Sequence, residues 1–260
     1  MLKRSTSKAA KLQIKNLHAT SGNTKILNGV SLVVSSGETH IIMGQNGSGK
    51  STLLAVLMGH PKYQVTRGSV KLNSTDLLKL TVPERAQAGI FLGFQHPQVV
   101  AGVGFGNFIR IARNTVTMAN DPKAEAIGPG PFVPILKAEM DRLKMDTAFV
   151  SRSINEGFSG GEKKKSEVLQ MALLQPRIAF LDEIDSGLDI DALKIVIQEL
   201  LAVQKQQGMG LVLVSHNPKI LEFLQPDKIH IMSKGRIIAE GTTDIIRKLE
   251  SGGYEAFLKR

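Results

Sequence analysis

The stretch Gly44-Gln-Asn-Gly-Ser-Gly49-Lys50-Ser51 decides the fold class of this chain. It follows Thr39–Met43, which reads as a short buried strand, and it leads into Lys50–Met58, whose composition predicts a helix. Glycines let successive backbone N–H groups curl around a polyphosphate, and the helix N-terminus adds positive potential. The order of strand, glycine-rich loop and helix therefore predicts a phosphate-binding loop of the P-loop type.

The side chains of this loop predict ATP and Mg²⁺ as ligands. A lysine at the position of Lys50 reaches the β- and γ-phosphates, and a hydroxyl at the position of Ser51 coordinates Mg²⁺. Gln45 stands where proline is common, a change that leaves its backbone N–H available. The predicted nucleotide-binding residues of the loop are Gly44, Gln45, Asn46, Gly47, Ser48, Gly49, Lys50, Ser51 and Thr52.

Two adjacent carboxylates, Asp182 and Glu183, follow the apolar run Ile178–Leu181. At the carboxyl end of a buried strand, an aspartate can contribute to a Mg²⁺ shell, and the next glutamate can orient or deprotonate an attacking water. An apolar strand followed by an acid is usually structural. Its position behind a phosphate loop makes a nucleotide site the better interpretation.

The remaining chain alternates short apolar runs with helical patterns, which predicts an α/β P-loop fold with a mostly parallel core sheet. An antiparallel β portion is expected at the N-terminus and a helical subdomain in the middle. Further predicted strands are Leu12–Leu17, Ser31–Val34, Ser69–Leu72, Ile90–Phe94 and Leu211–Val214, and further predicted helices are Phe105–Met118, Ile135–Lys144, Gly161–Leu174 and Ile190–Gln206. Between the first two of these helices, the prolines and glycines of residues 121–134 predict irregular structure.

These patterns suggest one domain with an insert. Residues 1–11 are basic and predict a flexible tail, and residues 12–260 form the domain. Within it, 12–95 and 166–260 are assigned to the catalytic core, and 96–165 to the helical subdomain.

Composition excludes several classes of protein. The formal net charge is +10, but aromatic residues make up 5% and tryptophan is absent, so stacking platforms for nucleic acid are poorly supplied. There is no cysteine, which excludes disulfides and thiolate metal sites and fits a reducing compartment. No apolar run reaches about 18 residues, the length that spans a membrane. We therefore expect a cytoplasmic protein, or one of the plastid stroma, with no nucleic-acid partner and no inserted segment.

A third motif, Phe158-Ser159-Gly160-Gly161-Glu162, resembles the signature loop of the ATP-binding cassette (ABC) ATPases. Alone, it would only mark a helix start, because serine is a good N-cap. The other parts of the ABC pattern then fall in order. Gln95 resembles the Q-loop residue, Ser186–Asp189 the D-loop, and His216, after Leu211–Val214, the switch histidine.

From about Leu12 onward, the chain is similar to the SufC family, the ABC-type ATPases of the SUF iron–sulfur cluster assembly machine. The most specific run is Asp185-Ser-Gly-Leu-Asp-Ile-Asp191, since transporter ATPases usually have Pro-Thr or Pro-Ser in place of Ile184-Asp185. Supporting similarity lies in Met58–Gly68, Asn155–Lys165 and Gly252–Leu258.

The resemblance implies a head-to-tail dimer that closes on two ATP molecules. Ser159, Gly160 and Gly161 of one copy would cover the nucleotide held by Lys50 of the other. The implied catalytic residues are Glu183 as general base, His216, Gln95 and Lys50, and the implied metal ligands are Ser51, Gln95 and Asp182. Closure would drive conformational change in SufB- and SufD-like scaffolds, and any iron–sulfur cluster would sit on a partner.

Two other functions stay open at this point. One is the ATPase subunit of a membrane ABC transporter, and the other is a nucleotide-gated module whose hydrolysis is incidental. A further hypothesis concerns Lys164, which could pair with Glu183 or Asp185 and hold the base away from water. Finally, Ser21 stands where many ABC ATPases have an aromatic ring that stacks on adenine, so weak base discrimination is expected.

Overall fold

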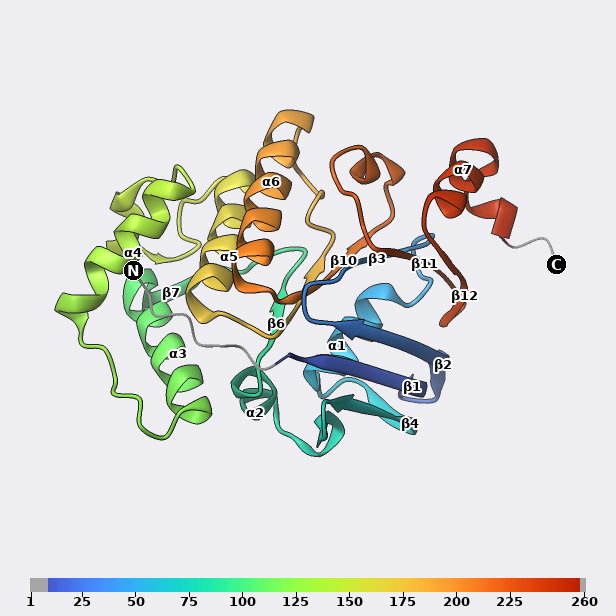
Figure 1. The fold of residues 1–260 in the computed structure, drawn as a ribbon, viewed down its shortest axis with the longest axis horizontal. Helices are drawn as coiled ribbons and strands as arrows, with labels where there is room; N and C mark the ends of the chain where they lie inside the picture. The colour runs from blue at the N-terminus through green and yellow to red at the C-terminus, as the bar shows by residue number, and fades with distance from the viewer. Residues whose placement is uncertain (1–8, 258–260) are drawn as a thin grey trace.

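Six strands form the central sheet, in the order β12-β11-β3-β10-β9-β6 (Figure 1). In this computed structural model, which describes residues 9–257, five of them run parallel and β12 joins the edge antiparallel. The strands are β3 (Thr39–Met43), β6 (Ile90–Gly93), β9 (Ile178–Asp182), β10 (Gly210–Ser215), β11 (Lys228–Ser233) and β12 (Arg236–Gly241). The predicted mostly parallel core sheet is confirmed, and β11 and β12 add strands that the sequence patterns did not reveal.

A separate antiparallel sheet of four strands, in the order β2-β1-β4-β5, confirms the predicted N-terminal β portion. Its strands are β1 (Lys11–Ser21), β2 (Thr24–Ser35), β4 (Gln64–Leu72) and β5 (Thr75–Asp76). Lys11 N donates to Asn73 Oδ1 at 2.8 Å, Asn73 Nδ2 donates to Ala9 O at 3.2 Å, and Ala10 is buried. Lys11 therefore begins β1, and Ala9 and Ala10, which precede the strand, are held against the sheet by hydrogen bonds of their backbone groups. The rest of the predicted tail, residues 1–8, lies outside the described residues.

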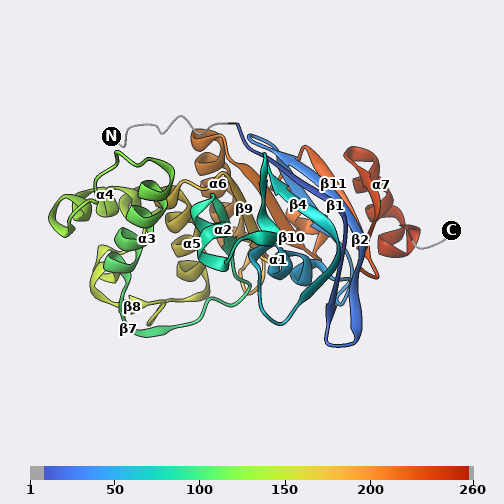
Figure 2. The same ribbon diagram turned by 90° about the horizontal axis from the view of Figure 1, so that it is seen from below.

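The core divides at the central sheet, because successive residues of a strand point to opposite faces. All five residues of β3 are buried, with Ile41 and Met43 in one cluster and Ile42 in the other. The first cluster packs under α5 (Gly160–Leu174) and α6 (Ile190–Gln207). The second lies between the central sheet, α1 (Lys50–Met58) and the antiparallel sheet, as Figures 1 and 2 show. The continuous apolar runs of the strands thus follow from burial on both faces.

The middle of the chain is mainly helical and lies beside α5 and α6, away from the antiparallel sheet (Figure 2). It contains β7 (Val100–Gly104), α3 (Phe105–Asn120), α4 (Pro129–Arg142) and β8 (Ser153–Ile154). The prediction of irregular structure over residues 121–134 is wrong from Pro129 onward. Pro129 and Pro131 lie in the first turn of α4, where no intrahelical N–H partner is needed, and only Pro134 lies inside the helix. The proposed subdomain boundaries at 96 and 165 stay a prediction.

The C-terminal end of α1 is held by an arginine from α2 (Val82–Gln87). Arg85 Nη1 donates to the carbonyl oxygens of Val56 and Leu57 at 2.9 and 2.8 Å, and Arg85 Nε donates to Leu80 O at 3.0 Å. Carbonyls of a last helical turn lack intrahelical partners, so this guanidinium satisfies them. The helix that begins at the phosphate loop is thereby fixed at its far end.

The described part of the chain ends with α7 (Thr243–Gly252) and the short 3₁₀ segment Gly253–Phe257, beside β11 and β12 (Figure 1). Within residues 9–257, none of the helices combines the length and apolar content that a membrane crossing needs.

Candidate active site

The phosphate loop joins the buried end of β3 to the first turn of α1, as predicted. Gly49, the N-cap of α1, has φ of 105°, a conformation that glycine adopts readily. A Cβ at Gly44 would collide with the Met232 carbonyl oxygen of β11. The motif thus needs glycine at both positions, one for the turn into the helix and one for close approach of the neighbouring strand.

Lys50 is folded back into the loop. Its Nζ donates to Gly44 O at 2.7 Å and to Gln45 O at 3.1 Å, and its side chain is buried. Burial lowers the pKa of Lys50, and the carboxylates of Glu183 and Asp182 counteract this shift. The ammonium therefore stands among acceptors inside the loop, where a phosphate oxygen would be a strong additional partner.

Ser51 and Asp182 come together from α1 and β9, as the sequence predicted. Ser51 Oγ donates to Asp182 Oδ1 at 3.1 Å. Burial raises the pKa of Asp182, and the hydrogen bond from Ser51 opposes the shift. A hydroxyl and a carboxylate oxygen side by side, with the Gln95 side chain near the same cavity, are the hard oxygen donors that Mg²⁺ prefers. The donor set therefore fits Mg²⁺.

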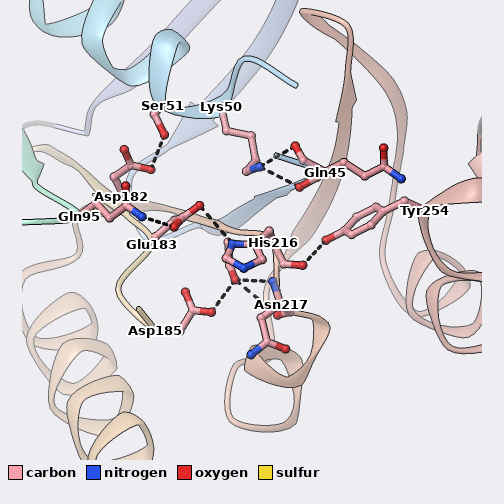
Figure 3. Close-up of polar contacts among 12 residues, drawn as sticks. Gln45, Lys50, Ser51, Gln95, Asp182, Glu183, Asp185, His216, Asn217 and Tyr254 are labelled. Carbon is pink, nitrogen blue, oxygen red and sulfur yellow. Dashed lines mark hydrogen bonds and ion pairs between the residues drawn. The ribbon is translucent and has the colours of Figure 1, made fainter. Parts of the chain in front are cut away.

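Glu183 follows directly after β9 and stands at the centre of the site (Figure 3). Its Oε2 accepts a short hydrogen bond from Gln95 Nε2, and its Oε1 lies 3.1 Å from His216 Nδ1. Its φ of 43° is unusual for a residue with a side chain, and such strained conformations gather at functional sites. Both carboxylate oxygens are therefore occupied by two of the residues that the sequence singled out.

A second polar network holds the loop after β10. Ser215 Oγ donates to Asp185 Oδ2 at 2.9 Å and accepts from Asn217 N at 2.9 Å, as Figure 3 shows. Burial raises the pKa of Asp185, against the hydrogen bond from Ser215. Ser215 and Asn217 were not predicted, although they flank His216 in sequence and that adjacency was an available signal.

Lys164 does not pair with Glu183 or Asp185, so that hypothesis is wrong. Its Nζ donates to Phe94 O at 2.7 Å and lies 3.3 Å from Glu167 Oε2. Glu167 is about one turn further along α5, on the same face of the helix. Lys164 therefore pairs with Glu167 and not with Glu183 or Asp185. In this structure Glu183 is restrained by Gln95 and His216 instead.

The nucleotide cavity has a volume of about 680 Å³. Much of its wall is the predicted phosphate loop with Gln95 and Glu183. The rest was not predicted and comes from two distant segments, around Ile26 and around Gly235. Ser21 is not part of the wall. The lining residues are Thr24, Lys25, Ile26, Asn28, Asn46, Gly47, Gly49, Lys50, Ser51, Thr52, Gln95, Glu183, Lys234 and Gly235.

The turn Lys234–Gly235 between β11 and β12 is hydrogen-bonded to both the phosphate loop and β2. Gly235 N donates to Ser48 O of the phosphate loop at 2.8 Å. Asn28 of β2 donates twice, from its backbone N to Gly235 O and from Nδ2 to Lys234 O, each at 2.8 Å. The turn therefore connects the phosphate loop to the antiparallel sheet. A Lys-Gly pair between two apolar runs was the sequence signal for it.

The signature loop lies apart from this cavity in the described chain. Ser159 caps α5, since Glu162 N donates to its Oγ at 3.3 Å and Ser159 N donates to Glu162 Oε2 at 2.7 Å. Ser159 and Gly160 are exposed, and neither they nor Gly161 belong to the cavity wall. The structure thus brings the predicted residues together in two groups, with Ser159, Gly160 and Gly161 separate from the rest.

Comparison with known proteins agrees with this geometry. The family profile described as "ABC transporter" matches residues 27–186. A protein of Cyanophora paradoxa described as "Probable ATP-dependent transporter ycf16" is 46% identical over 254 residues, covering 96% of each chain. "Vegetative protein 296" of Bacillus subtilis is 43% identical over 247 residues, covering 95% of this chain and 93% of that protein.

Solved structures support the fold. A nucleotide-free ATP-binding cassette from an ABC transporter superposes with a TM-score of 0.77 at 23% identity, over 96% of this chain and 99% of the other. The phosphate loop, the paired carboxylates and the relatives at 43–46% identity all indicate the same family. The chain is an ATP-hydrolysing member of the ABC ATPase family, in the SufC group that its motifs indicate.

Proposed function

We propose that this chain is the ATP-hydrolysing subunit of an iron–sulfur cluster assembly complex of the SUF type. It would close on ATP and drive conformational change in SufB- and SufD-like scaffold subunits. The observation that supports hydrolysis is that Glu183 contacts both Gln95 and His216. These contacts lie beside Lys50 and Ser51. The assembly role rests on the Asp185–Asp191 run and on the family it resembles.

The geometry suggests how the residues divide the work of hydrolysis. Lys50 would leave the Gly44 and Gln45 carbonyls for the β- and γ-phosphates, while backbone N–H groups at the start of α1 hold phosphate oxygens. Mg²⁺ held by Ser51, Asp182 and Gln95 would neutralise phosphate charge. Positioning and electrostatics of this kind account for most catalysis of phosphoryl transfer.

Glu183 would orient and deprotonate the attacking water. To do so it must release one of its two present partners, because both oxygens accept hydrogen bonds. Gln95 is also one of the proposed Mg²⁺ ligands, so a Gln95 side chain that held the ion would no longer donate to Glu183 Oε2. His216 would then keep the carboxylate in place and stabilise charge on the transferred group.

A second copy of the chain would complete the site. Ser159, Gly160 and Gly161 lie away from the cavity of their own copy and present exposed groups to solvent. The capping box uses the N–H groups of Ser159 and Glu162, so the N–H groups of Gly160 and Gly161 are the ones proposed to face a phosphate of the partner copy, where a helix N-terminus favours an anion. The proposal is therefore a head-to-tail dimer with two ATP molecules at its interface.

The scaffold contact is proposed at exposed apolar residues of the segment that runs from Phe94 into α3. Phe94 is 60% exposed, Val99 51% and Ile111 50%, and Phe108 lies on the same helix as Ile111. Exposed apolar groups of this kind mark protein interaction sites. Since Phe94 precedes Gln95, a partner here would respond directly to movement of the Gln95 side chain.

The alternative is the ATPase subunit of a membrane transporter, which the name of the Cyanophora paradoxa relative, "Probable ATP-dependent transporter ycf16", favours. One experiment separates the two. Tagged chain carrying Glu183→Gln, with and without ATP and Mg²⁺, is used as bait in a native extract divided into soluble and membrane fractions. Capture of soluble SufB- and SufD-like proteins supports the proposal, and capture of a membrane permease overturns it in favour of the transporter.

The dimer has its own test. Because the chain contains no cysteine, a pair introduced as Ser159→Cys and Thr52→Cys supplies the only two thiols of this chain. With Glu183→Gln, ATP, Mg²⁺ and the scaffold subunits present, a crosslinked dimer is expected. Failure to crosslink under these conditions would contradict the head-to-tail dimer.

We place the complex in the cytoplasm, or in a plastid stroma, because a chain without cysteine fits a reducing compartment.

A further inference from the structure

Tyr254, three residues before Phe257 at the end of the described chain, reaches the active site from the C-terminal 3₁₀ segment. Its Oη donates to the backbone carbonyl oxygen of His216 at 2.9 Å (Figure 3). The Gly44 backbone, at the start of the phosphate loop, also lies close enough to the Tyr254 hydroxyl to lower its pKa. One phenol group therefore joins three segments that are far apart in sequence.

The ring of Tyr254 is fixed by packing. It lies against the apolar cluster under α5 and α6, and with Gln45 and Met232 it walls a void of about 10 Å³, room for about one water molecule. Burial raises the pKa of Tyr254 to about 12, although the hydrogen bond from Gly44 opposes the shift. The group is therefore a neutral hydroxyl that donates one hydrogen bond and accepts another.

The peptide unit between His216 and Asn217 is held at both of its polar ends. Its carbonyl oxygen accepts from Tyr254 at 2.9 Å, and its N–H, that of Asn217, donates to Ser215 Oγ at 2.9 Å. The orientation of this peptide sets the direction of the His216 side chain, whose Nδ1 lies 3.1 Å from Glu183 Oε1. Loss of either anchor would let the peptide rotate and the imidazole turn from Glu183.

We propose that Tyr254 is a positioning residue for ATP hydrolysis, which holds His216 against Glu183 and links its orientation to the phosphate loop through Gly44. It does not touch the reacting atoms and acts through the His216 carbonyl. The inference rests on the proposed roles of His216 and Glu183. It assigns a function to the C-terminal segment that none of the sequence motifs suggested.

Tyr254→Phe tests the proposal, because it keeps the ring and removes only the hydroxyl. We expect kcat for ATP to fall about tenfold, the effect of one lost hydrogen bond, while KM for ATP changes less than twofold. Without the Tyr254 hydroxyl, the peptide unit between His216 and Asn217 can rotate. This rotation should change the ¹⁵N signals of the His216 imidazole in the absence of nucleotide. Unchanged kcat together with unchanged His216 signals would overturn the proposal.

The chain supplies a matched control. It contains only two tyrosines, and the other, Tyr63, lies beside His60 and Lys62, away from the cavity. Tyr63→Phe should leave kcat, KM and the His216 signals as in the parent chain. If Tyr63→Phe lowers kcat as much as Tyr254→Phe does, loss of a tyrosine hydroxyl acts through general stability and the proposal fails.

His216→Ala separates failure of this inference from failure of the proposed function. If His216→Ala hydrolyses ATP normally, the catalytic assignment is wrong. If His216→Ala is inactive while Tyr254→Phe matches the parent, only the positioning role is wrong.

A further measurement tests the proposal without measuring ATP hydrolysis. In the Tyr63→Phe chain, which has no tryptophan, fluorescence comes from Tyr254 alone and should change when ATP and Mg²⁺ bind. Constant fluorescence would contradict the link through Gly44.

Discussion

Glu183 Oε1 lies 3.1 Å from His216 Nδ1, although 33 positions separate the two residues. The contact exists because β9 and β10 are neighbouring parallel strands, so the residues that follow them meet at one edge of the sheet. With Gln95 on its other oxygen, both carboxylate oxygens of Glu183 have hydrogen-bond partners. If Glu183 is the general base that we propose, one of these hydrogen bonds must be exchanged before catalysis.

Glu183→Gln should lower kcat for ATP by roughly 10²- to 10⁴-fold, the usual contribution of a general base. The amide is nearly isosteric, so ATP binding should remain and the nucleotide should be trapped unhydrolysed. Single-turnover hydrolysis and equilibrium binding of labelled ATP measure the two effects. Hydrolysis within tenfold of the parent rate would show that another group activates the water.

Ser51→Ala should weaken Mg²⁺-dependent activity more than ATP binding itself, because it removes the hydroxyl that stands beside Asp182 Oδ1. The Mg²⁺ concentration for half-maximal hydrolysis should rise about tenfold or more, a typical loss when a metal site is disturbed. Thr52→Ala, which changes a neighbouring hydroxyl, is the matched control and should shift this concentration less. Equal shifts in both variants would place the metal elsewhere.

Glu167 should make stability depend on pH. Burial raises its pKa from an ordinary 4.5 to about 7, despite the nearby Lys164. The folded state therefore binds more protons than the unfolded state between these values. The associated stability is present below pH 4.5 and is lost as the pH rises toward 7, by up to about 3 kcal/mol.

Urea unfolding at several pH values checks this dependence. Glu167→Gln removes the titrating group, so the free energy of unfolding of the variant relative to the parent should increase from pH 5 to pH 8. A difference that stays constant over this range, or that decreases, would contradict the raised pKa.

Arg85→Met should destabilise the fold by about 1–3 kcal/mol. The change keeps most of the side-chain volume but leaves the Leu57 carbonyl without its donor and the Val56 carbonyl with Gly59 N alone. Chemical denaturation measures the free energy of unfolding. Arg67→Met, at an exposed arginine of β4, is the control and should cost less than about 0.5 kcal/mol. Equal costs would mean that capping of α1 is unimportant.

Local pattern predicted much of the architecture. The predicted helix Lys50–Met58 coincides with α1, and the predicted strand Leu211–Val214 lies inside β10. Both segments combine strong periodicity or burial with clear glycine boundaries, so local preference and tertiary packing agree. The helix α4 was placed too late, because proline reads as a breaker unless the position of the first turn is known.

The site was predicted where motifs are contiguous and missed where the fold alone brings residues together. Lys50, Ser51, Asp182 and Glu183 lie in recognisable runs. Tyr254 and the Lys234–Gly235 turn were not assigned a role, because their contacts depend on how distant elements pack. The contact between the buried residues His40 and His230 was missed for the same reason. His40 Nδ1 lies 3.0 Å from His230 Nε2, although 190 positions separate the two residues.

The wall of the nucleotide cavity combines Thr24–Asn28 from near the start of the chain with Lys234–Gly235 from near its end. During synthesis, which proceeds from the N-terminus, the phosphate loop leaves the ribosome long before the turn that supports Ser48. A growing chain therefore cannot form the complete cavity until almost all of it has been translated. Nucleotide should consequently stabilise the finished polypeptide and not its shorter nascent forms.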